Sequence, residues 1–442
     1  MKENANQLAR LIDAIRECET VRRVGRVEQF YGSVLECAGP DAFLGEVCEV
    51  FSPGQLTSIA AEVVGFRHGR VLLMPLGRVT GIHVGSEVVA TGLPASVTVN
   101  DGMLGKVVNA FGTPLDGGVL SSPGKSYPLY REPINPMERA PCDEPLNLGV
   151  RVIDAFCAMA KGQRVGIFAG SGVGKSTLLG MIAKQCDAEV NVIALIGERG
   201  REVSEFIQDN LGSDGLKKSV VVAATADEPA LVRVHAAFVA TAIAEYFKDK
   251  GKHVMLYMDS ITRLATAQRE IGLAIGEPPT SRGYTPSTFS LLPRLTERAG
   301  IFKSGGSISA LYTVLVEGDD FNEPVSDTVR SILDGHIMLK RQLAHQGIFP
   351  AIDIRESMSR LFPRVTGKEQ QMAVRELIRL ESLYQESKEL IELGAYKQGG
   401  DPEIDQAIRV HKALNKFISQ SEGESGSNRD IVTALKQVLS GK

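Results

Sequence analysis

The chain has 442 residues, of which 43% are hydrophobic and 23% are charged, and its formal net charge is -4. This composition is typical of a globular protein with roughly two to four domains of 100–200 residues each, and it lacks the basic excess that indicates a nucleic-acid partner. The six cysteines are scattered without a Cys-x-x-Cys pair, which excludes the common metal-binding and redox spacings and favours reduced thiols in a cytosolic protein.

The first residues are polar and the chain contains no run of about 18 apolar residues, so we expect neither a secretory signal nor a membrane span. Residues 6–18 carry apolar side chains at three-to-four spacing, which predicts a short amphipathic helix. Two interpretations of residues 1–20 stay open at this point: a helix packed on its own domain, or an element that docks on a partner or a membrane surface.

Residues 21–94 contain short β-branched runs that alternate with glycines, which predicts a small barrel or sandwich. Residues 95–150, punctuated by Pro and Gly, form an irregular lead-in. From residue 150 to about 350, apolar runs alternate with helical stretches, which predicts a parallel sheet with helices on both faces. The expected strands are 165–169, 190–196, 219–224, 253–258 and 307–315, and the expected helices include 176–186, 229–248, 368–395, 403–420 and 429–439.

A glycine-rich loop follows the expected strand 165–169 and nearly fits the phosphate-binding pattern GxxxxGK[ST], with Ala169 in place of the first glycine. Glycines let backbone N–H groups approach phosphates closely, and the following helix N-terminus adds a partial positive charge. Lys175 is expected to reach the β- and γ-phosphates, and the Ser176 hydroxyl to ligate magnesium. The loop residues expected to bind ATP are Ala169, Gly170, Ser171, Gly172, Val173, Gly174, Lys175, Ser176 and Thr177.

Two carboxylates follow expected strands. Asp259 ends the apolar run 253–258 at the sheet edge where ligands bind in open α/β folds, so it can hold magnesium through a water. Glu198 follows strand 190–196, where it can face the γ-phosphate and polarise the attacking water. A solvated charge cluster is the competing interpretation of the run around Glu198.

Several motifs together resemble the rotary-ATPase family, and within it the sequence is similar to the ATPases of type III secretion, found in the flagellar export apparatus and the virulence injectisome. The resemblance covers nearly the whole chain and is weakest at residues 1–20 and 420–442. The matching segments are Ala169–Thr177, Gly197–Val203, Met258–Arg263, Gly276–Tyr284, Leu315–Asp320 and Ser331–His336.

The resemblance implies an α/β subunit with a small N-terminal β-barrel at 21–94, a RecA-like P-loop NTPase core at 95–364 and a C-terminal α-helical domain at 365–442. It also implies a ring of six with ATP between subunits. By motif match, Lys175, Glu198 and Arg199 are catalytic, and Arg199 and Arg263 line the same pocket. Phe349 packs against adenine, and Arg360 is the arginine finger of the next subunit's site. Such a finger is worth about 10³–10⁵ in rate.

The same resemblance implies the partners of a homohexamer. The loop 276–286 would face the central channel, where it would meet a stalk protein or substrate, with a plain surface loop as the alternative. A regulator or stator protein would bind at the N-terminus. Export chaperone–substrate complexes and a membrane export gate would be further partners, and nucleic acid would not. The protein is therefore expected in the cytoplasm, peripheral at the cytoplasmic face of the inner membrane.

Four functions compete at this stage. ATP hydrolysis that drives type III protein export leads, because Gly197–Val203 fits the export branch better than the synthase branch and the chain lacks a long C-terminal extension. The catalytic subunit of a proton-translocating ATP synthase is second. An RNA-translocating ring ATPase would need a basic, aromatic barrel face. A non-catalytic nucleotide-binding scaffold would lack the carboxylate of Glu198.

Overall fold

The computed structural model describes residues 23–52, 57–120, 123–316, 318, 320–321, 323–424 and 430–441. Within these ranges the chain forms two compact units. One reaches to Ala95 and includes Ala274–Gly276, and the other consists of Ser96–Leu273 and Glu277–Lys442. The helix expected over 6–18, and with it the docking element at 1–20, lies outside the described residues, as does most of the link expected near 422–428.

The first unit is a closed antiparallel barrel. Of the two folds that the sequence predicts for residues 21–94, the structure therefore has the barrel and not the sandwich. Mainly small and β-branched side chains fill the interior, among them Cys37, Cys48 and Val50, which are fully buried. The strand order is β1-β2-β5-β4-β3-β6. The strands are β1 (Val24–Tyr31), β2 (Val34–Ala38), β3 (Glu46–Phe51), β4 (Ser58–Arg67), β5 (Arg70–Pro75) and β6 (Glu87–Pro94).

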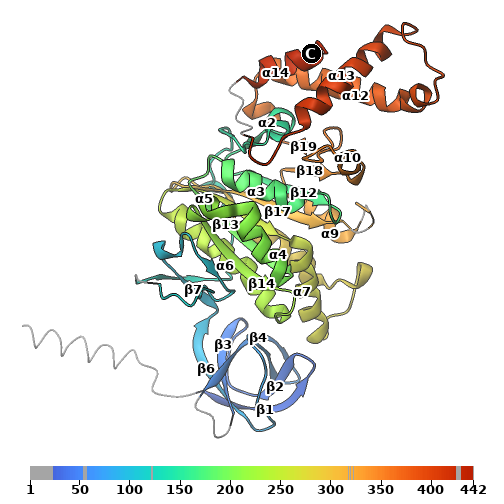
Figure 1. The fold of residues 1–442 in the computed structure, drawn as a ribbon. Helices are drawn as coiled ribbons and strands as arrows, with labels where there is room; N and C mark the ends of the chain where they lie inside the picture. The colour runs from blue at the N-terminus through green and yellow to red at the C-terminus, as the bar shows by residue number, and fades with distance from the viewer. Residues whose placement is uncertain are drawn as a thin grey trace, which may run out of the picture. The chain divides into compact units, whose positions relative to one another are not determined.

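The second unit is built on a nine-stranded sheet, counted over the described residues, whose central ladder is parallel (Figure 1). The five strands expected from the sequence lie in its middle and are confirmed. The strand order is β19-β18-β12-β17-β15-β13-β14-β8, with β16 paired to β17. The strands are β8 (Val107–Val108), β12 (Arg164–Ala169), β13 (Val190–Glu198), β14 (Ser219–Thr225), β15 (His253–Asp259), β16 (Gly300–Ile301), β17 (Ser307–Leu315), β18 (Gly335–Leu339) and β19 (Met358–Ser359).

Helix α6 (Ala230–Asp249) packs on β13, β14 and β15. Among the described residues it is the helix long and apolar enough to span a membrane by composition, and 89% of its most apolar window is buried within the protein. Its apolar character is explained by contact with the sheet. The other helices around the sheet are α3 (Lys175–Gln185), α4 (Gly200–Glu205), the π-helical turn η3 (Phe206–Leu211), α5 (Gly212–Lys217), α7 (Ile261–Ala274), α8 (Pro286–Thr296), α9 (Pro324–Ile332) and α10 (Arg341–His345).

Short elements connect these parts. The strand pairs are β7 (Ser96–Val99) with β9 (Lys125–Pro128) and β10 (Pro145–Leu146) with β11 (Met159–Ala160). The short helical turns are η1 (Asp101–Met103), η2 (Pro136–Glu138), η4 (Ser281–Gly283), α2 (Arg151–Phe156) and α11 (Phe362–Val365).

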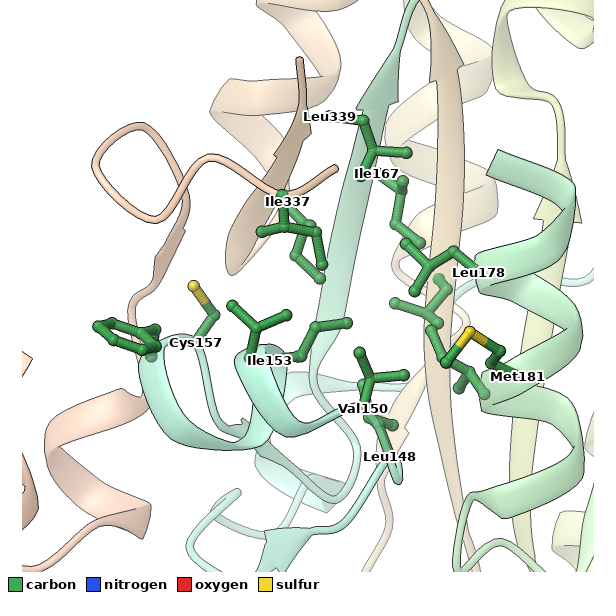
Figure 2. Packing of buried hydrophobic residues seen from close by; sticks show 14 of the residues in the cluster. Leu148, Val150, Ile153, Cys157, Ile167, Leu178, Met181, Ile337 and Leu339 are labelled. Carbon is green, nitrogen blue, oxygen red and sulfur yellow. The ribbon is translucent and has the colours of Figure 1, made fainter. Parts of the chain in front are cut away.

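The C-terminal helices share a hydrophobic core with the sheet. They are α12 (Lys368–Glu392), α13 (Pro402–Ile418) and α14 (Ile431–Leu439). One cluster of buried side chains runs from α3 and β12 through α2 to these helices, and Phe156 meets Phe417 edge to face with ring centroids 6.3 Å apart. Figure 2 shows the centre of this cluster, where Ile153 and Cys157 of the α2 region lie near Ile337 of β18. Because the core is continuous, we expect the C-terminal helices and the sheet to unfold together.

Substitution on α12 tests this continuity. Leu377 is 0% exposed and belongs to the shared core, whereas Met372 on the same helix is 70% exposed. We expect Leu377→Ala to lower the free energy of unfolding by about 2–5 kcal/mol, because it leaves a cavity. Met372→Ala should change it by less than about 0.5 kcal/mol. Urea unfolding followed by circular dichroism measures both, and equal effects of the two substitutions would contradict the shared core.

Candidate active site

The phosphate-binding loop connects β12 to α3, as the sequence predicted. Gly174 caps the helix with φ +85° and Gly172 has φ +76°, a left-handed conformation that other residues adopt only with strain. A Cβ atom on Gly172 would meet no atom within 4 Å, so the loop borders open space there. The 11-residue helix α3 directs its N-terminus at this space, which makes the loop suited to bind an anion.

Three charged side chains from three different segments meet at this loop. The Lys175 Nζ atom forms an ion pair with Asp259 Oδ1 and lies 3.7 Å from Glu198 Oε1. The Thr313 hydroxyl of β17 donates a hydrogen bond of 2.7 Å to the same Asp259 oxygen. The lysine side chain is 12% exposed and that of Glu198 15%. The structure therefore brings together the lysine and the two carboxylates that were predicted from the sequence to form the site.

Glu198 differs from its expected position in one detail. It was expected in the loop after β13, but it is the last residue of that strand. The pairing of β13 with β14 slips between Ile196 and Glu198, where Gly197 has φ +70°. The irregular pairing extends the strand by two residues and still leaves the carboxylate at the sheet edge.

The surroundings of Glu198 favour its protonated form. Burial raises the pKa of Glu198 to about 7, the charge of Asp259 acts in the same direction, and the Lys175 ammonium group opposes both. Glu198 Oε1 is buried and accepts no hydrogen bond within the described residues. A buried carboxylate oxygen without a hydrogen bond is rare in folded proteins, and here it is free to accept one from a bound water.

A small cavity of about 50 Å³ adjoins these groups and is lined by Ser176, Leu195, Glu198, Glu202, Val203, Phe206 and Asp259. Glu202 and Thr313 were not identified from the sequence as site residues. Glu202 lies four residues after Glu198 on α4, and its hydrogen bond with Glu198 lowers the pKa of Glu202. Glu202 lies within the same charged run as Glu198, which was a usable local signal, whereas the contact of Thr313 with Asp259 spans 54 residues and left no local pattern.

Ser176 and Asp259 are suited to hold a magnesium ion that arrives with a nucleotide. Both line the same cavity. Magnesium in nucleotide sites takes one or two protein ligands together with phosphates and waters, so it needs no complete protein cage. Across the described ranges, no group of three or more His, Cys, Asp or Glu side chains is arranged to hold a metal. A hydroxyl and a carboxylate beside a phosphate loop fit this chemistry.

Of the other residues matched by resemblance, Phe349 lies at the P-loop, Arg263 lies beside β13 near Glu198, and Arg199 lies apart from both. A Cβ atom on Gly174 would lie 3.5 Å from the Phe349 ring, and one on Gly197 would lie 3.1 Å from the Arg263 side chain. Arg199 instead is 81% exposed and pairs with Glu202 at 3.1 Å, where it takes part in capping α4. Its guanidinium group is directed to solvent in this structure.

Arg360 lies apart from the cavity at the P-loop. It borders a separate hollow of about 380 Å³, lined by Asp327, Arg330, Ser331, His336, Met358 and Arg360. Its side chain is exposed and, within the described residues, makes no hydrogen bond or ion pair. An exposed guanidinium group without an internal partner is available to a second molecule.

Comparison with known proteins agrees with this geometry. Residues 149–359 match the nucleotide-binding domain of the ATP synthase alpha/beta family, and residues 27–92 match its beta-barrel domain. Residues 366–437 match the type III secretion (T3SS) EscN ATPase C-terminal domain. The flagellum-specific ATP synthase of Bacillus subtilis (strain 168) is 51% identical over 426 residues, which cover 96% of this chain and 97% of that protein.

Solved structures give the same result. The assembled ATPase EscN from the type III secretion system of enteropathogenic E. coli matches with a TM-score of 0.89 and 44% identity, over 94% of this chain and 100% of that one. EscN in complex with its central stalk EscO matches with a TM-score of 0.85 and 43% identity, over 94% of this chain and 100% of that one. The chain therefore belongs to the ATP synthase alpha/beta family and, within it, to the ATPases of flagellar and type III secretion.

Proposed function

We propose that the chain hydrolyses ATP in a site completed by a neighbouring copy, and that this hydrolysis drives protein export through a type III secretion apparatus. The observation that carries the proposal is the position of Lys175 between Glu198 and Asp259 at the P-loop. A nucleoside triphosphate would bring phosphate oxygens to a lysine whose ammonium group already faces two carboxylates.

Each group has a defined task in this proposal. The loop backbone and Lys175 bind the β- and γ-phosphates, and Ser176 with Asp259 holds magnesium. The ion, when bound, supplies positive charge that offsets the charge of the phosphates. Glu198 accepts a hydrogen bond from the attacking water and takes its proton, for which a pKa near neutrality is favourable. Phe349 and Arg263 border the nucleotide, and Arg199 joins them only if its side chain turns inward.

The neighbouring copy supplies Arg360. Strand β12 is six residues long, so its two ends lie roughly 16 Å apart at about 3.3 Å per residue. The P-loop follows one end, and the pairing of β18 with β12 and β19 places Ser359 near the other. The distance supports a finger that acts on another copy. A closed homohexamer satisfies this head-to-tail arrangement for every subunit.

The wider partners follow from the family. In the ring, the loop 276–286 would contact a central stalk, and residues 1–20 would bind a regulator or stator protein. ATP turnover would release export chaperones, unfold their substrates and deliver them to the membrane export gate. The protein would then work at the cytoplasmic face of the inner membrane.

Replacing Glu198 by Gln tests the catalytic carboxylate. We expect kcat to fall by about 10²–10⁴, because an amide cannot take the proton of the water. Binding of a fluorescent ATP analogue should be retained, and secretion of export substrates from cells carrying the variant should stop. Glu205→Gln, an exposed carboxylate on α4, is the matched control and should leave hydrolysis unchanged. Wild-type turnover by Glu198→Gln would refute the assigned role.

Replacing Arg360 by Ala tests the shared site. We expect a loss of about 10³–10⁵ in kcat with ATP binding intact, because the charge on the transferred phosphoryl group would lose its finger. Wild-type specific activity should rise steeply with protein concentration, since subunits must meet to hydrolyse ATP. The control is Arg364→Ala, an exposed arginine four residues further on. Specific activity that does not depend on concentration, together with a harmless Arg360→Ala, would rule out the shared site.

The raised pKa of Glu198 predicts a pH dependence. The carboxylate form is the active base, so kcat/KM for ATP should fall as pH drops below about 7, approaching tenfold per pH unit. Steady-state hydrolysis between about pH 5.5 and 9 measures the profile, and nucleotide affinity at each pH separates binding from chemistry. The residual activity of Glu198→Gln should lack this inflection. A wild-type profile that is flat across neutral pH would exclude Glu198 as the titrating base.

A further inference from the structure

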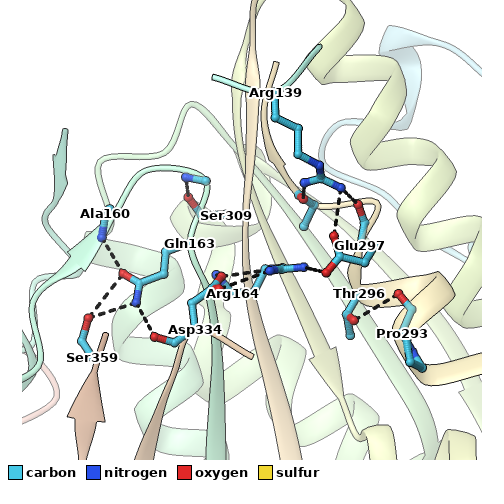
Figure 3. A network of polar contacts seen from close by, with 12 residues as sticks. Arg139, Ala160, Gln163, Arg164, Pro293, Thr296, Glu297, Ser309, Asp334 and Ser359 are labelled. Atoms are coloured by element: carbon cyan, nitrogen blue, oxygen red, sulfur yellow. Dashed lines mark hydrogen bonds and ion pairs between the residues drawn. The ribbon is translucent and has the colours of Figure 1, made fainter. Parts of the chain in front are cut away.

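Arg164 connects two segments that are far apart in the sequence (Figure 3). It begins strand β12, and its side chain is 14% exposed. Its Nε and Nη2 atoms donate to the two carboxylate oxygens of Asp334 at 3.0 and 3.2 Å, and its Nη1 atom donates to Glu297. The guanidinium group thus holds Asp334 with a bidentate pair and Glu297 with a third hydrogen bond, a geometry that the planar arginine fork favours.

On one side, this contact supports the segment that carries Arg360. The backbone N–H of Arg360 donates to the Asp334 carbonyl oxygen at 2.9 Å. Gln163 donates to the same carbonyl and to the Ser359 hydroxyl, each at 3.0 Å. Strand β19, which precedes Arg360, has only two residues. Because so short a strand has few ladder bonds, the position of Arg360 depends on Asp334 and its partners.

On the other side, the contact reaches the end of α8. Glu297 is the C-cap residue of this helix. Its carboxylate also accepts a hydrogen bond of 3.1 Å from Arg139, which in turn donates to the Ala299 carbonyl at 2.8 Å. Helix α8 begins at Pro286, the last residue of the loop 276–286 that is proposed to face the stalk. The bridge Asp334–Arg164–Glu297 therefore joins the Arg360 segment to the far end of the helix that follows this loop.

We propose that Arg164 is a positioning residue for Arg360, and that its contact with Glu297 couples the arginine finger to helix α8. This inference rests on the proposed function, in which Arg360 completes the site of a neighbouring copy. Arg164 lies at the opposite end of β12 from its own P-loop, roughly 16 Å away at about 3.3 Å per residue. Through Arg360, Arg164 would therefore affect hydrolysis of the ATP bound to the neighbouring copy.

Two variants probe the bridge. Arg164→Lys keeps the positive charge between the carboxylates but cannot form the three-point fork. Glu297→Gln leaves the Arg164–Asp334 pair in place and is the gentler change if Arg164→Lys does not fold. A misplaced catalytic group costs about 10²-fold, so we expect kcat losses of roughly that size for Arg164→Lys and smaller ones for Glu297→Gln. Nucleotide affinity and assembly should be unchanged, and Glu144→Gln, an exposed ion-pair partner of Lys161, should be neutral.

Mixed assemblies show whether Arg164→Lys impairs the arginine finger given to a neighbouring subunit or the ATP site of the variant subunit itself. Arg164→Lys subunits retain an intact P-loop site, and Glu198→Gln subunits retain an intact finger. When equal amounts are mixed at low concentration and then assembled, about half of the Arg164→Lys sites acquire a Glu198→Gln neighbour. We expect hydrolysis to rise well above the sum of the two proteins measured separately. A mixture of Arg360→Ala with Glu198→Gln is the reference.

The outcomes separate the two proposals. Rescue means hydrolysis well above the sum of the two separate proteins. Rescue of both Arg164→Lys and Arg360→Ala by Glu198→Gln supports Arg164 as a positioning residue for the finger. Rescue with Arg360→Ala but not with Arg164→Lys overturns the inference, since the bridge would then act within its own subunit. Wild-type kcat in both bridge variants overturns it as well. Lack of rescue in the reference mixture refutes the shared site itself, and the inference falls with it.

Discussion

The contact of the Lys175 ammonium group with the carboxylates of Glu198 and Asp259 is the interaction on which the rest of the nucleotide unit depends. Each charge alone would be costly to bury at the sheet edge, and removing one partner would leave the others uncompensated. The two carboxylates end neighbouring parallel strands whose remaining side chains are almost all buried. Their spacing is therefore fixed by the backbone pairing of a rigid core.

The same core explains why a helical C-terminal region belongs to a nucleotide-binding unit. Gln420, just after α13, donates its backbone N–H to the Phe349 carbonyl at 2.9 Å. Its side chain accepts from the Arg151 backbone at 2.8 Å and donates to the Gly149 carbonyl at 2.9 Å. One glutamine thus connects the C-terminal helices, the start of α2 and the aromatic residue beside the P-loop. A displacement of α13 would be transmitted to Phe349 through these bonds.

Much of the fold and of the P-loop site could be predicted from the sequence, because the signals are local. The apolar runs of β13 and β15, each followed by a carboxylate, identify buried strands and the edge at which they end. By contrast, Arg164 and Asp334 are 170 residues apart, and β19 is too short to have a hydrophobic pattern. Contacts of this kind depend on the strand order, which a single sequence does not reveal. The exposure of Arg199 likewise depends on how α4 is capped.

The arrangement of charges constrains how such a chain can work. The carboxylates and Lys175 lie at the carboxyl ends of the central strands, while Arg360 follows a strand paired to the beginning of β18. In the proposed function, a single copy therefore carries the two halves of a catalytic site at opposite ends of the strands of one sheet. Bringing them together within one copy would require rebuilding a sheet whose strands are buried on both faces, whereas a neighbouring copy can present Arg360 without any change in the core. For the proposed shared site, assembly is therefore the less costly arrangement, and the contacts that hold Arg360 in place would then serve the site of the next subunit.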